Sequence, residues 1–253
     1  MKRLAIKKLI VISQSESRSL EVPFENGLNI ILGGNKTGKS SIIKSIFTTL
    51  GCECKRIETD WKKLISAYLL FFKYGEKQFC VVRQGKKFQI FENNEDSYSC
   101  IIETETFHEY SNCLMDILEI KMPCISKDGK QFNVTPPLLF RFQYIDQDEG
   151  WSRIADSFNF YVVDTPNQQG QDAENLGSIF KSLELFLSDE GQVIVGTERE
   201  TGLEGKASNV IKLTEKRRCL NTINYSKHLE LLEELQKTAI SWVAFNHKAK
   251  NEK

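Results

Sequence analysis

The sequence predicts an α/β fold in which an antiparallel, strand-rich first lobe is followed by a parallel-sheet core. Three observations support this prediction. The run "GGNKTGKSS" (residues 33–41) fits the phosphate-binding pattern G-x-x-x-x-G-K-[ST], the P-loop, between an apolar strand and a helix. Short strands separated by tight turns follow it, as in antiparallel hairpins. In the second half of the chain a strand, a helix and a strand alternate, which favours parallel pairing.

The composition is that of an ordinary globular protein. Of 253 residues, 40% are hydrophobic and 27% are charged, and 34 basic residues balance 34 acidic ones, so the net charge indicates neither nucleic-acid nor membrane binding. No apolar run approaches the roughly 20 residues of a membrane helix, and the basic start "MKRLAIKKLIVIS" is predicted to be a strand rather than a signal peptide. Seven cysteines without metal-type spacing indicate reduced thiols, so we expect a cytoplasmic protein.

The first lobe is expected to span residues 1–150 and to carry the P-loop. Strands are predicted on both sides of the P-loop helix, and a second helix, a turn and a short apolar segment follow them. The predicted strands are 4–13, 19–24, 28–32, 68–75, 77–85 and 87–93, the helices are 40–51 and 106–120, the turn is 126–130 and the apolar segment is 138–145.

The second lobe is expected to span residues 151–253. Its two continuous apolar runs, "FNFYVV" and "QVIVGT", are predicted to be buried parallel strands on either side of an amphipathic helix. The predicted strands are 158–163, 192–197 and 209–213, and the predicted helices are 173–188 and 226–245, the latter ending in a basic tail.

The P-loop predicts a nucleotide site. Successive backbone N–H groups and the positive end of the following helix face the phosphates, and glycine lets the backbone approach them closely. Lys39 is expected to reach the β- and γ-phosphates, and the Ser40 hydroxyl is expected to bind Mg²⁺. The predicted nucleotide-binding residues are Gly33, Asn35, Lys36, Thr37, Gly38, Lys39, Ser40 and Ser41.

Asp164 is the candidate for the second half of this site. It ends the apolar run "FNFYVV", and a carboxylate at the end of a neighbouring strand is what Mg²⁺ beside a P-loop requires, the Walker B pattern. The alternative interpretation is a turn, since Asp before Thr-Pro commonly starts one. The P-loop upstream favours the metal-binding role.

These motifs together resemble a known family. The stretch from residue 9 to residue 46, with its "GGNKTGKSS" loop, resembles the opening of ABC-type ATPase heads of the SMC and double-strand-break-repair class. The segment "DTPNQQGQD" is similar to the family's Walker B and D-loop, with Asp164 and Pro166 at the matching positions and Asp172 one residue later than the usual D-loop aspartate. The resemblance implies an ABC-type P-loop NTPase head that uses ATP and Mg²⁺.

The resemblance also implies further site residues. Gln147 in "YIDQDEGW" matches the Q-loop glutamine that senses Mg²⁺, with Gln143 as a rival, and a surface glutamine is the alternative for both. Thr165 stands where the family has its catalytic glutamate. Glu198 stands at the switch histidine position and is the candidate for orienting water beside the catalytic Asp164. Glu174 is a weaker candidate, and for both glutamates a solvated surface position is the alternative.

The sequence departs from the family between Gln147 and the Walker B strand. Family members carry a long coiled coil and a signature segment there, whereas this chain has only "GWSRIADSF" before the strand. Two interpretations remain open: a natural minimal head, or a chain that lacks an internal segment of the cellular protein.

The resemblance implies an ATPase head with slow turnover in this chain alone. Such a head would dimerise across ATP·Mg²⁺ and gate action on DNA, in repair or in bacterial defence against foreign DNA, with an effector or nuclease partner and no membrane. One alternative is a nucleotide switch that recruits an effector without hydrolysis, favoured by Thr165. A small-molecule kinase is a third interpretation, but the sequence shows no lid with arginines.

Overall fold

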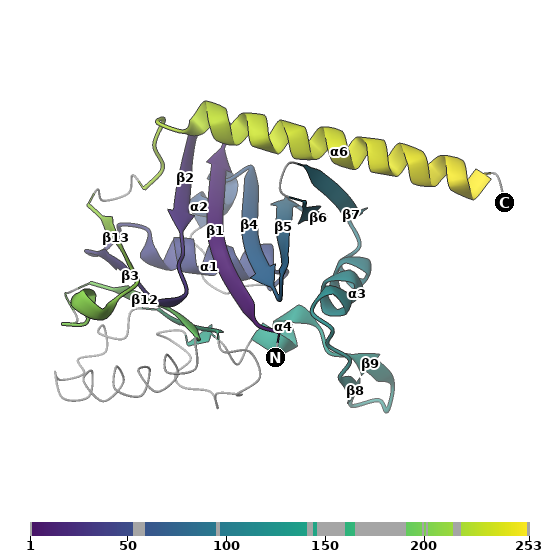
Figure 1. Ribbon diagram of the computed structural model, residues 1–253, viewed down its shortest axis with the longest axis horizontal. Coiled ribbons are helices and arrows are strands. Elements are labelled where there is room, and N and C mark those ends of the chain that lie inside the picture. The colour runs from purple at the N-terminus through teal and green to yellow at the C-terminus, as the bar shows by residue number, and fades with distance from the viewer. Residues whose placement is uncertain are drawn as a thin grey trace.

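The computed structural model describes residues 2–52, 59–94, 97–140, 144–145, 160–164, 191–198, 200, 202–214 and 219–251. Within these ranges the strands form a six-stranded sheet, a five-stranded sheet and a small hairpin (Figure 1). The six-stranded sheet is antiparallel throughout and the five-stranded sheet is parallel throughout. The predicted fold class, an antiparallel lobe joined to a parallel P-loop core, is therefore confirmed.

The antiparallel sheet has the order β2-β1-β4-β5-β6-β7. Both of its faces are covered, which is why buried apolar residues occur at odd and even positions along its strands. Its last strand, β7, was not predicted, because "YSCIIET" mixes polar and apolar residues without clear alternation. The strands are β1 (Leu4–Ser13), β2 (Arg18–Pro23), β4 (Ala67–Tyr74), β5 (Lys77–Gln84), β6 (Lys87–Asn93) and β7 (Tyr98–Thr104).

The parallel sheet has the order β10-β11-β12-β3-β13. The strand that leads into the P-loop, β3, lies next to β12, and β12 separates it from β11, the strand that ends at Asp164. The strands are β3 (Gly27–Gly33), β10 (Tyr144–Ile145), β11 (Phe160–Asp164), β12 (Gln192–Thr197) and β13 (Asn209–Leu213). The predicted helix at 173–188 lies outside the described residues.

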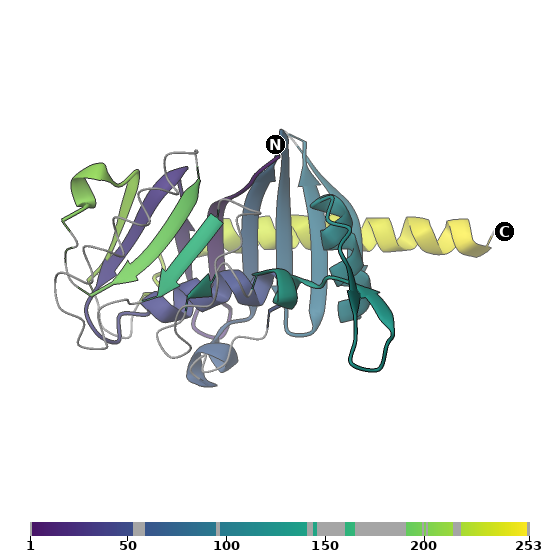
Figure 2. The same cartoon turned by 90° about the horizontal axis from the view of Figure 1, so that it is seen from below.

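Helix α1 (Lys39–Thr49) packs between the two sheets. It contacts β4 and β5 of the antiparallel sheet and β3, β11 and β12 of the parallel sheet (Figure 2). Ile42, Ile43, Ile46 and Phe47 are buried in the largest apolar cluster of the described chain, which spans both sheets. The predicted helical spacing of these residues is confirmed, and their burial fixes the P-loop to the core.

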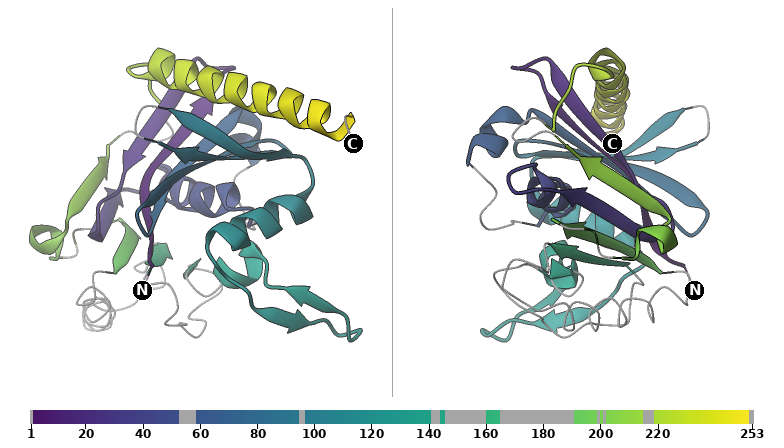
Figure 3. Two further views of the ribbon diagram at one scale, coloured as in Figure 1. Left: turned by 45° about the vertical axis from the view of Figure 1, so that its right-hand side comes forward. Right: turned by 90° about the vertical axis from the view of Figure 1, so that its left-hand side faces the viewer.

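Helix α6 (Tyr225–Asn251) covers the other face of the antiparallel sheet (Figure 3). Its Leu232, Leu235 and Ala239 are fully buried against the side chains that β1, β4 and β5 turn away from α1. The helix extends past residue 245, where the sequence predicted a basic tail. None of the helices among the described residues carries an apolar stretch long enough to cross a bilayer.

The remaining elements lie mainly at the ends of the antiparallel sheet. A short hairpin projects from the body beside α3 (Figure 3), and its turn matches the predicted turn at 126–130. These elements are α2 (Thr59–Leu64), α3 (Phe107–Ile117), β8 (Pro123–Ile125), β9 (Gln131–Asn133), α4 (Pro136–Phe140) and a 3₁₀ helix (Glu204–Lys206). The division into lobes at residue 150 stays a prediction, and we note that β3 contributes to the parallel sheet and α6 to the first lobe.

Buried side-chain hydrogen bonds connect the start of β12 to β1. Gln192 is 2% exposed; its Oε1 accepts a hydrogen bond from the backbone N–H of Ile6, and its Nε2 donates to the carbonyl oxygens of Ile6 and Glu25, each at 2.8 Å. The register of β1 against β4 shifts between Ile6 and Lys8, so β1 carries a β-bulge at this point. Gln192 therefore bridges the two sheets at the bulge.

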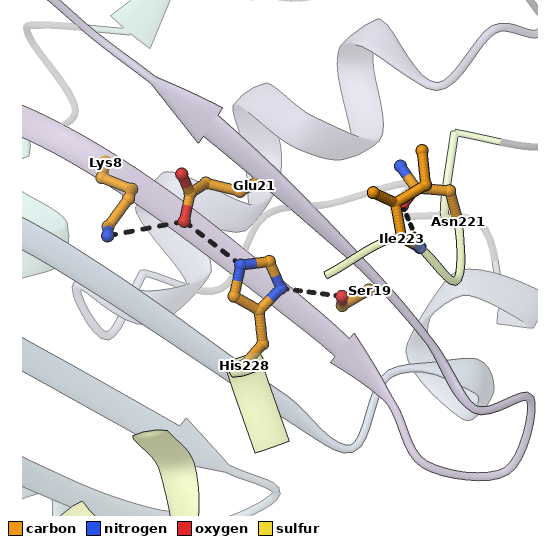
Figure 4. Close-up of polar contacts among 6 residues, drawn as sticks. All are labelled: Lys8, Ser19, Glu21, Asn221, Ile223 and His228. Atoms are coloured by element: carbon orange, nitrogen blue, oxygen red, sulfur yellow. Dashed lines mark hydrogen bonds and ion pairs between the residues drawn. The ribbon is translucent and has the colours of Figure 1, made fainter. Parts of the chain in front are cut away.

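A second buried contact fixes the start of α6 to β2. His228 in the first turns of α6 is 2% exposed, its Nδ1 lies 2.7 Å from Ser19 Oγ, and its Nε2 lies 3.1 Å from Glu21 Oε2 (Figure 4). Lys8 pairs with the same Glu21 carboxylate at 3.4 Å. Burial lowers the pKa of His228, and the hydrogen bond that the imidazole donates to the Glu21 carboxylate opposes that shift. The imidazole thus joins the C-terminal helix to the sheet.

Candidate nucleotide-binding site

The candidate site lies where three parallel strands end together. In the register of the sheet, Asp164 at the end of β11 pairs with Gly196, Thr197 pairs with Leu32, and Gly33 pairs with Leu213. The carboxyl ends of β3, β11 and β12 therefore meet at one edge, where ligands bind in open parallel sheets. The P-loop, Asp164 and Glu198 emerge at this edge.

The P-loop requires glycine at two positions. Gly38 has a φ of 96°, and a methyl group on it would lie 2.9 Å from Cys219 Sγ. A methyl group on Gly33 would lie 2.8 Å from the carbonyl oxygen of Leu213 in β13. The loop thus packs closely against the end of β13 and against Cys219, and its backbone turns sharply at Gly38.

The residues between these glycines divide into an exposed tip and a buried base. Gly34, Asn35 and Lys36 are exposed at the tip, and Lys36 has a positive φ of 63°. Thr37 is 2% exposed, and its Oγ1 donates a 2.9 Å hydrogen bond to the carbonyl oxygen of Gly34. This bond closes the loop on itself, so its shape is fixed by its own side chain.

Lys39 points back into the loop. Its Nζ donates to the carbonyl oxygens of Gly33 at 2.6 Å and Gly34 at 3.0 Å, and the residue is only 5% exposed. Burial lowers the pKa of Lys39, whereas the negative charges of Glu198 and Asp164 raise it. The ammonium group therefore lies between the loop and the two carboxylates. A phosphate oxygen could replace the Gly33 and Gly34 carbonyl oxygens as its hydrogen-bond acceptor.

Ser40 and Asp164 are brought together although they lie 124 residues apart in the sequence. Ser40 Oγ donates a 3.0 Å hydrogen bond to Asp164 Oδ1, and Asp164 is 3% exposed. Neighbouring ligands in an octahedral magnesium shell, each about 2.1 Å from the metal, lie about 3 Å apart. The hydroxyl and carboxylate oxygens therefore fit two adjacent positions around Mg²⁺.

Glu198 follows directly after β12, beside the strand that leads into the P-loop. Its side chain is half-buried, and its charge acts on Lys39. This position places a second carboxylate near Lys39, in addition to Asp164. The strand residue before it, Thr197, is fully buried, so the backbone that carries Glu198 is held by the core.

Several predicted residues are not placed. Gln147, its rival Gln143, Thr165, Pro166, Asp172 and Glu174 lie outside the described residues. Sequence reasoning also missed Cys219, whose sulfur lies close to Gly38 and whose pKa burial raises to about 11. Nothing in its local sequence signals this contact, because the P-loop lies about 180 residues away in the chain.

Similarity searches find relatives for part of the chain. The chain is 32% identical over 165 residues to Lamassu protein LmuB from Bacillus cereus (strain VD014), covering 63% of this chain and 27% of that protein. It is 32% identical over 89 residues to the DNA double-strand break repair Rad50 ATPase of Nanoarchaeum equitans (strain Kin4-M), covering 34% of this chain and 10% of the relative. The chain thus spans about a quarter of LmuB and a smaller share of Rad50. No family model matches the chain.

A comparison of structures returns SMC heads. The SMC head domain from Thermotoga maritima aligns with a TM-score of 0.45 and 13% identity, covering 82% of this chain and 94% of that chain. Two other findings are independent of that structural alignment. The strand that leads into the P-loop lies within a parallel sheet, and the sequence is similar to those of Rad50 and LmuB. The sequence similarity to LmuB and Rad50 confirms the resemblance to ATPase heads of the SMC and double-strand-break-repair class that the sequence predicts.

Proposed function

We propose that the chain binds ATP·Mg²⁺ at the P-loop and acts as the ATPase head of an SMC-like protein in the cytoplasm. The observation that carries the proposal is the 3.0 Å contact between Ser40 and Asp164 beside the buried Lys39. If Asp164 served only to start a turn at the end of β11, its side chain would not need to contact a serine. The contact with Ser40 therefore favours the metal-binding interpretation of Asp164.

In this proposal each described residue has one task. The loop N–H groups from Gly34 to Ser40 face the phosphates, and Lys39 exchanges its loop carbonyls for the β- and γ-phosphates. Ser40 and Asp164 hold the metal, which supplies charge neutralisation at the phosphates when bound. Glu198 stands where it can orient water, while Gln147 is proposed as a further metal contact.

We further propose that two heads associate across the nucleotide, and that this association gates action on DNA. Support comes from the similarity to a DNA double-strand break repair ATPase. Action on DNA in repair or in defence against foreign DNA, and an effector or nuclease partner, are part of the same proposal. The non-hydrolysing switch is the second candidate, because Thr165 occupies the catalytic glutamate position.

The test separates binding from hydrolysis. Fluorescent ATP is titrated with Mg²⁺ into the full chain, its Lys39→Ala variant and its Lys62→Ala variant, which removes an exposed lysine from α2. We expect Lys39→Ala to weaken binding at least about 100-fold, because a buried charge-assisted phosphate contact is lost, and Lys62→Ala to bind normally. Retained affinity in Lys39→Ala would refute the P-loop assignment.

Phosphate release then distinguishes the two candidates. If the chain is an ATPase, Glu198→Gln should lower phosphate release by about 10²-fold or more while ATP affinity changes little, because water loses its orienting carboxylate. If the chain binds ATP tightly but releases no phosphate above the Lys39→Ala background, it acts as the non-hydrolysing switch. This conclusion holds with or without ATP-dependent dimers in light scattering.

A further inference from the structure

A basic cleft lies at the junction of the two sheets, at the end of the parallel sheet away from the P-loop. The cleft, here called the seam cleft, has a volume of about 640 Å³. It is lined by the start of β1, the β4–β5 turn, the segment before β3 and the first residue of β12. A cavity of this size is in the range of small-ligand sites.

The seam cleft is separate from the nucleotide site. Asn26 precedes β3 and Gln192 begins β12, so both line the cleft at the amino ends of strands whose carboxyl ends carry the P-loop and Glu198. Gln192 and Thr197 are the first and last residues of β12, five residue steps apart, which corresponds to about 17 Å of extended strand. A ligand in the seam cleft would therefore not contact the nucleotide.

Positive charge predominates in the cleft. Lys2, Arg3, Lys7 and Lys73 line it together with one carboxylate, Glu76, and Lys2 is paired with the exposed Glu119. Lys73 pairs with Glu76 at 3.0 Å, but the Glu76 side chain is 96% exposed, and exposed pairs of this kind are weak. The whole chain has no net charge, so this excess is a local feature of the cleft.

The β-bulge in β1 directs this charge inward. Strand side chains normally alternate between faces, but the shift between Ile6 and Lys8 breaks the alternation. Lys8 lies on the α6 side, over the ring of Phe71, whereas the Nζ of Lys7 donates to Asn26 Oδ1 at 3.0 Å on the cleft side. The hydrogen bonds of Gln192 to Ile6 fix the bulge, which preorganises Lys7 in the cleft.

The chemistry of the lining points to phosphates. Leu4 and Ala5 are the apolar side chains among the described lining residues, and none of these residues is aromatic. Bases bind by stacking on aromatic rings, and peptides bind mainly through apolar anchors in pockets. We propose that the seam cleft binds a ligand with clustered phosphates, which is either a free polyphosphorylated small molecule or the backbone of a nucleic acid.

The first arm of the test uses inorganic tripolyphosphate and isothermal titration. Because the P-loop also binds phosphates, the titration is done in the Lys39→Ala chain, where a second site remains visible. We expect an Arg3→Gln/Lys7→Gln pair added to that chain to weaken binding by about tenfold or more. A Lys62→Gln/Lys86→Gln pair, which removes the same charge from exposed positions elsewhere, should leave it unchanged.

A conservative variant serves as the control for misfolding. Lys7→Arg keeps the charge at the bulge and should retain tripolyphosphate binding, with unchanged circular dichroism in every variant. Equal losses in the cleft pair and the control pair, or no binding at all in Lys39→Ala, would overturn the proposal. Neither result would affect the ATP titration of the intact P-loop, so the two proposals fail independently.

The second arm distinguishes the sources of phosphate. If the ligand is a nucleic-acid backbone, a labelled 20-base-pair duplex should compete with tripolyphosphate, and the cleft pair should reduce the salt slope of duplex binding by about two. If the ligand is a small molecule, the duplex should not compete. Equally tight binding of an acidic peptide, poly-glutamate, would overturn the preference for phosphate.

Discussion

Replacing Gln192 with leucine tests whether one buried amide holds the two sheets together. Leucine has nearly the same volume and an apolar side chain, so it leaves little cavity and removes only the hydrogen bonds. The N–H and the carbonyl oxygen of Ile6, a residue with no exposure, then lose their Gln192 partners. Glu25 is exposed, so its carbonyl oxygen can turn to water.

The expected loss follows from those two groups. Leaving a buried polar group unsatisfied costs about 1–3 kcal/mol, so the two groups together should lower the free energy of unfolding of Gln192→Leu by about 2–6 kcal/mol. With a urea slope of about 3 kcal/mol/M for a chain of this size, the unfolding midpoint should fall by about 0.7–2 M. Circular dichroism and tryptophan fluorescence during a urea titration measure this shift.

A matched substitution provides the control. Gln131 lies on the projecting strand β9 and is exposed, so Gln131→Leu should leave the midpoint nearly unchanged. If Gln192→Leu also unfolds within the error of the wild-type midpoint, the amide does not bridge the sheets. Gln192 would then not preorganise Lys7 in the seam cleft either.

Two further predictions concern the metal site and the C-terminal helix. Asp164→Asn should keep nucleotide binding measurable but remove its dependence on Mg²⁺, because the carboxylate beside Ser40 is lost; an unchanged response of ATP affinity to EDTA would exclude Asp164 from the site. The lowered pKa of His228 means that the unfolded chain binds its proton more tightly, so stability should be fully present above about pH 6.5 and fall as the pH drops through the folded pKa. Urea midpoints at pH 7.5 and 5.5 should therefore differ less in His228→Gln than in the wild type, and an equal difference would show that His228 does not titrate.

The P-loop could be predicted from sequence because its determinants are contiguous. Eight positions, the preceding apolar run and the following helical spacing all lie within about 25 residues. Asp164 was recognisable because an apolar strand that ends in aspartate, downstream of a P-loop, is the pattern that a magnesium ligand requires. The structure adds the 3.0 Å contact to Ser40, which no local pattern contains.

Contacts between distant segments could not be predicted. Gln192 was placed in a buried strand, but its partners, Ile6 and Glu25, lie more than 160 residues away. The amphipathic spacing of Leu232 and Leu235 predicted a helix with one buried face, yet nothing in it indicates which sheet that face covers. Strand β7 was missed because its two faces are only partly buried, so neither polar nor apolar residues recur at a fixed interval.

The difference between contiguous motifs and contacts between distant segments also separates ATP binding from ATP hydrolysis in this molecule. The groups that we propose hold the phosphates come from one continuous segment, Gly33 to Ser41, whose shape is fixed by hydrogen bonds from its own Thr37 and Lys39. The groups that would cleave ATP must come from other segments, and Thr165 removes the family's usual base from the sequence. Of the two described carboxylates at the site, Asp164 contacts Ser40, and the charges of both Asp164 and Glu198 act on Lys39. In the proposed function, nucleotide affinity therefore depends on local structure, and turnover would depend on whether other segments of the chain, or a second head, bring water to Glu198.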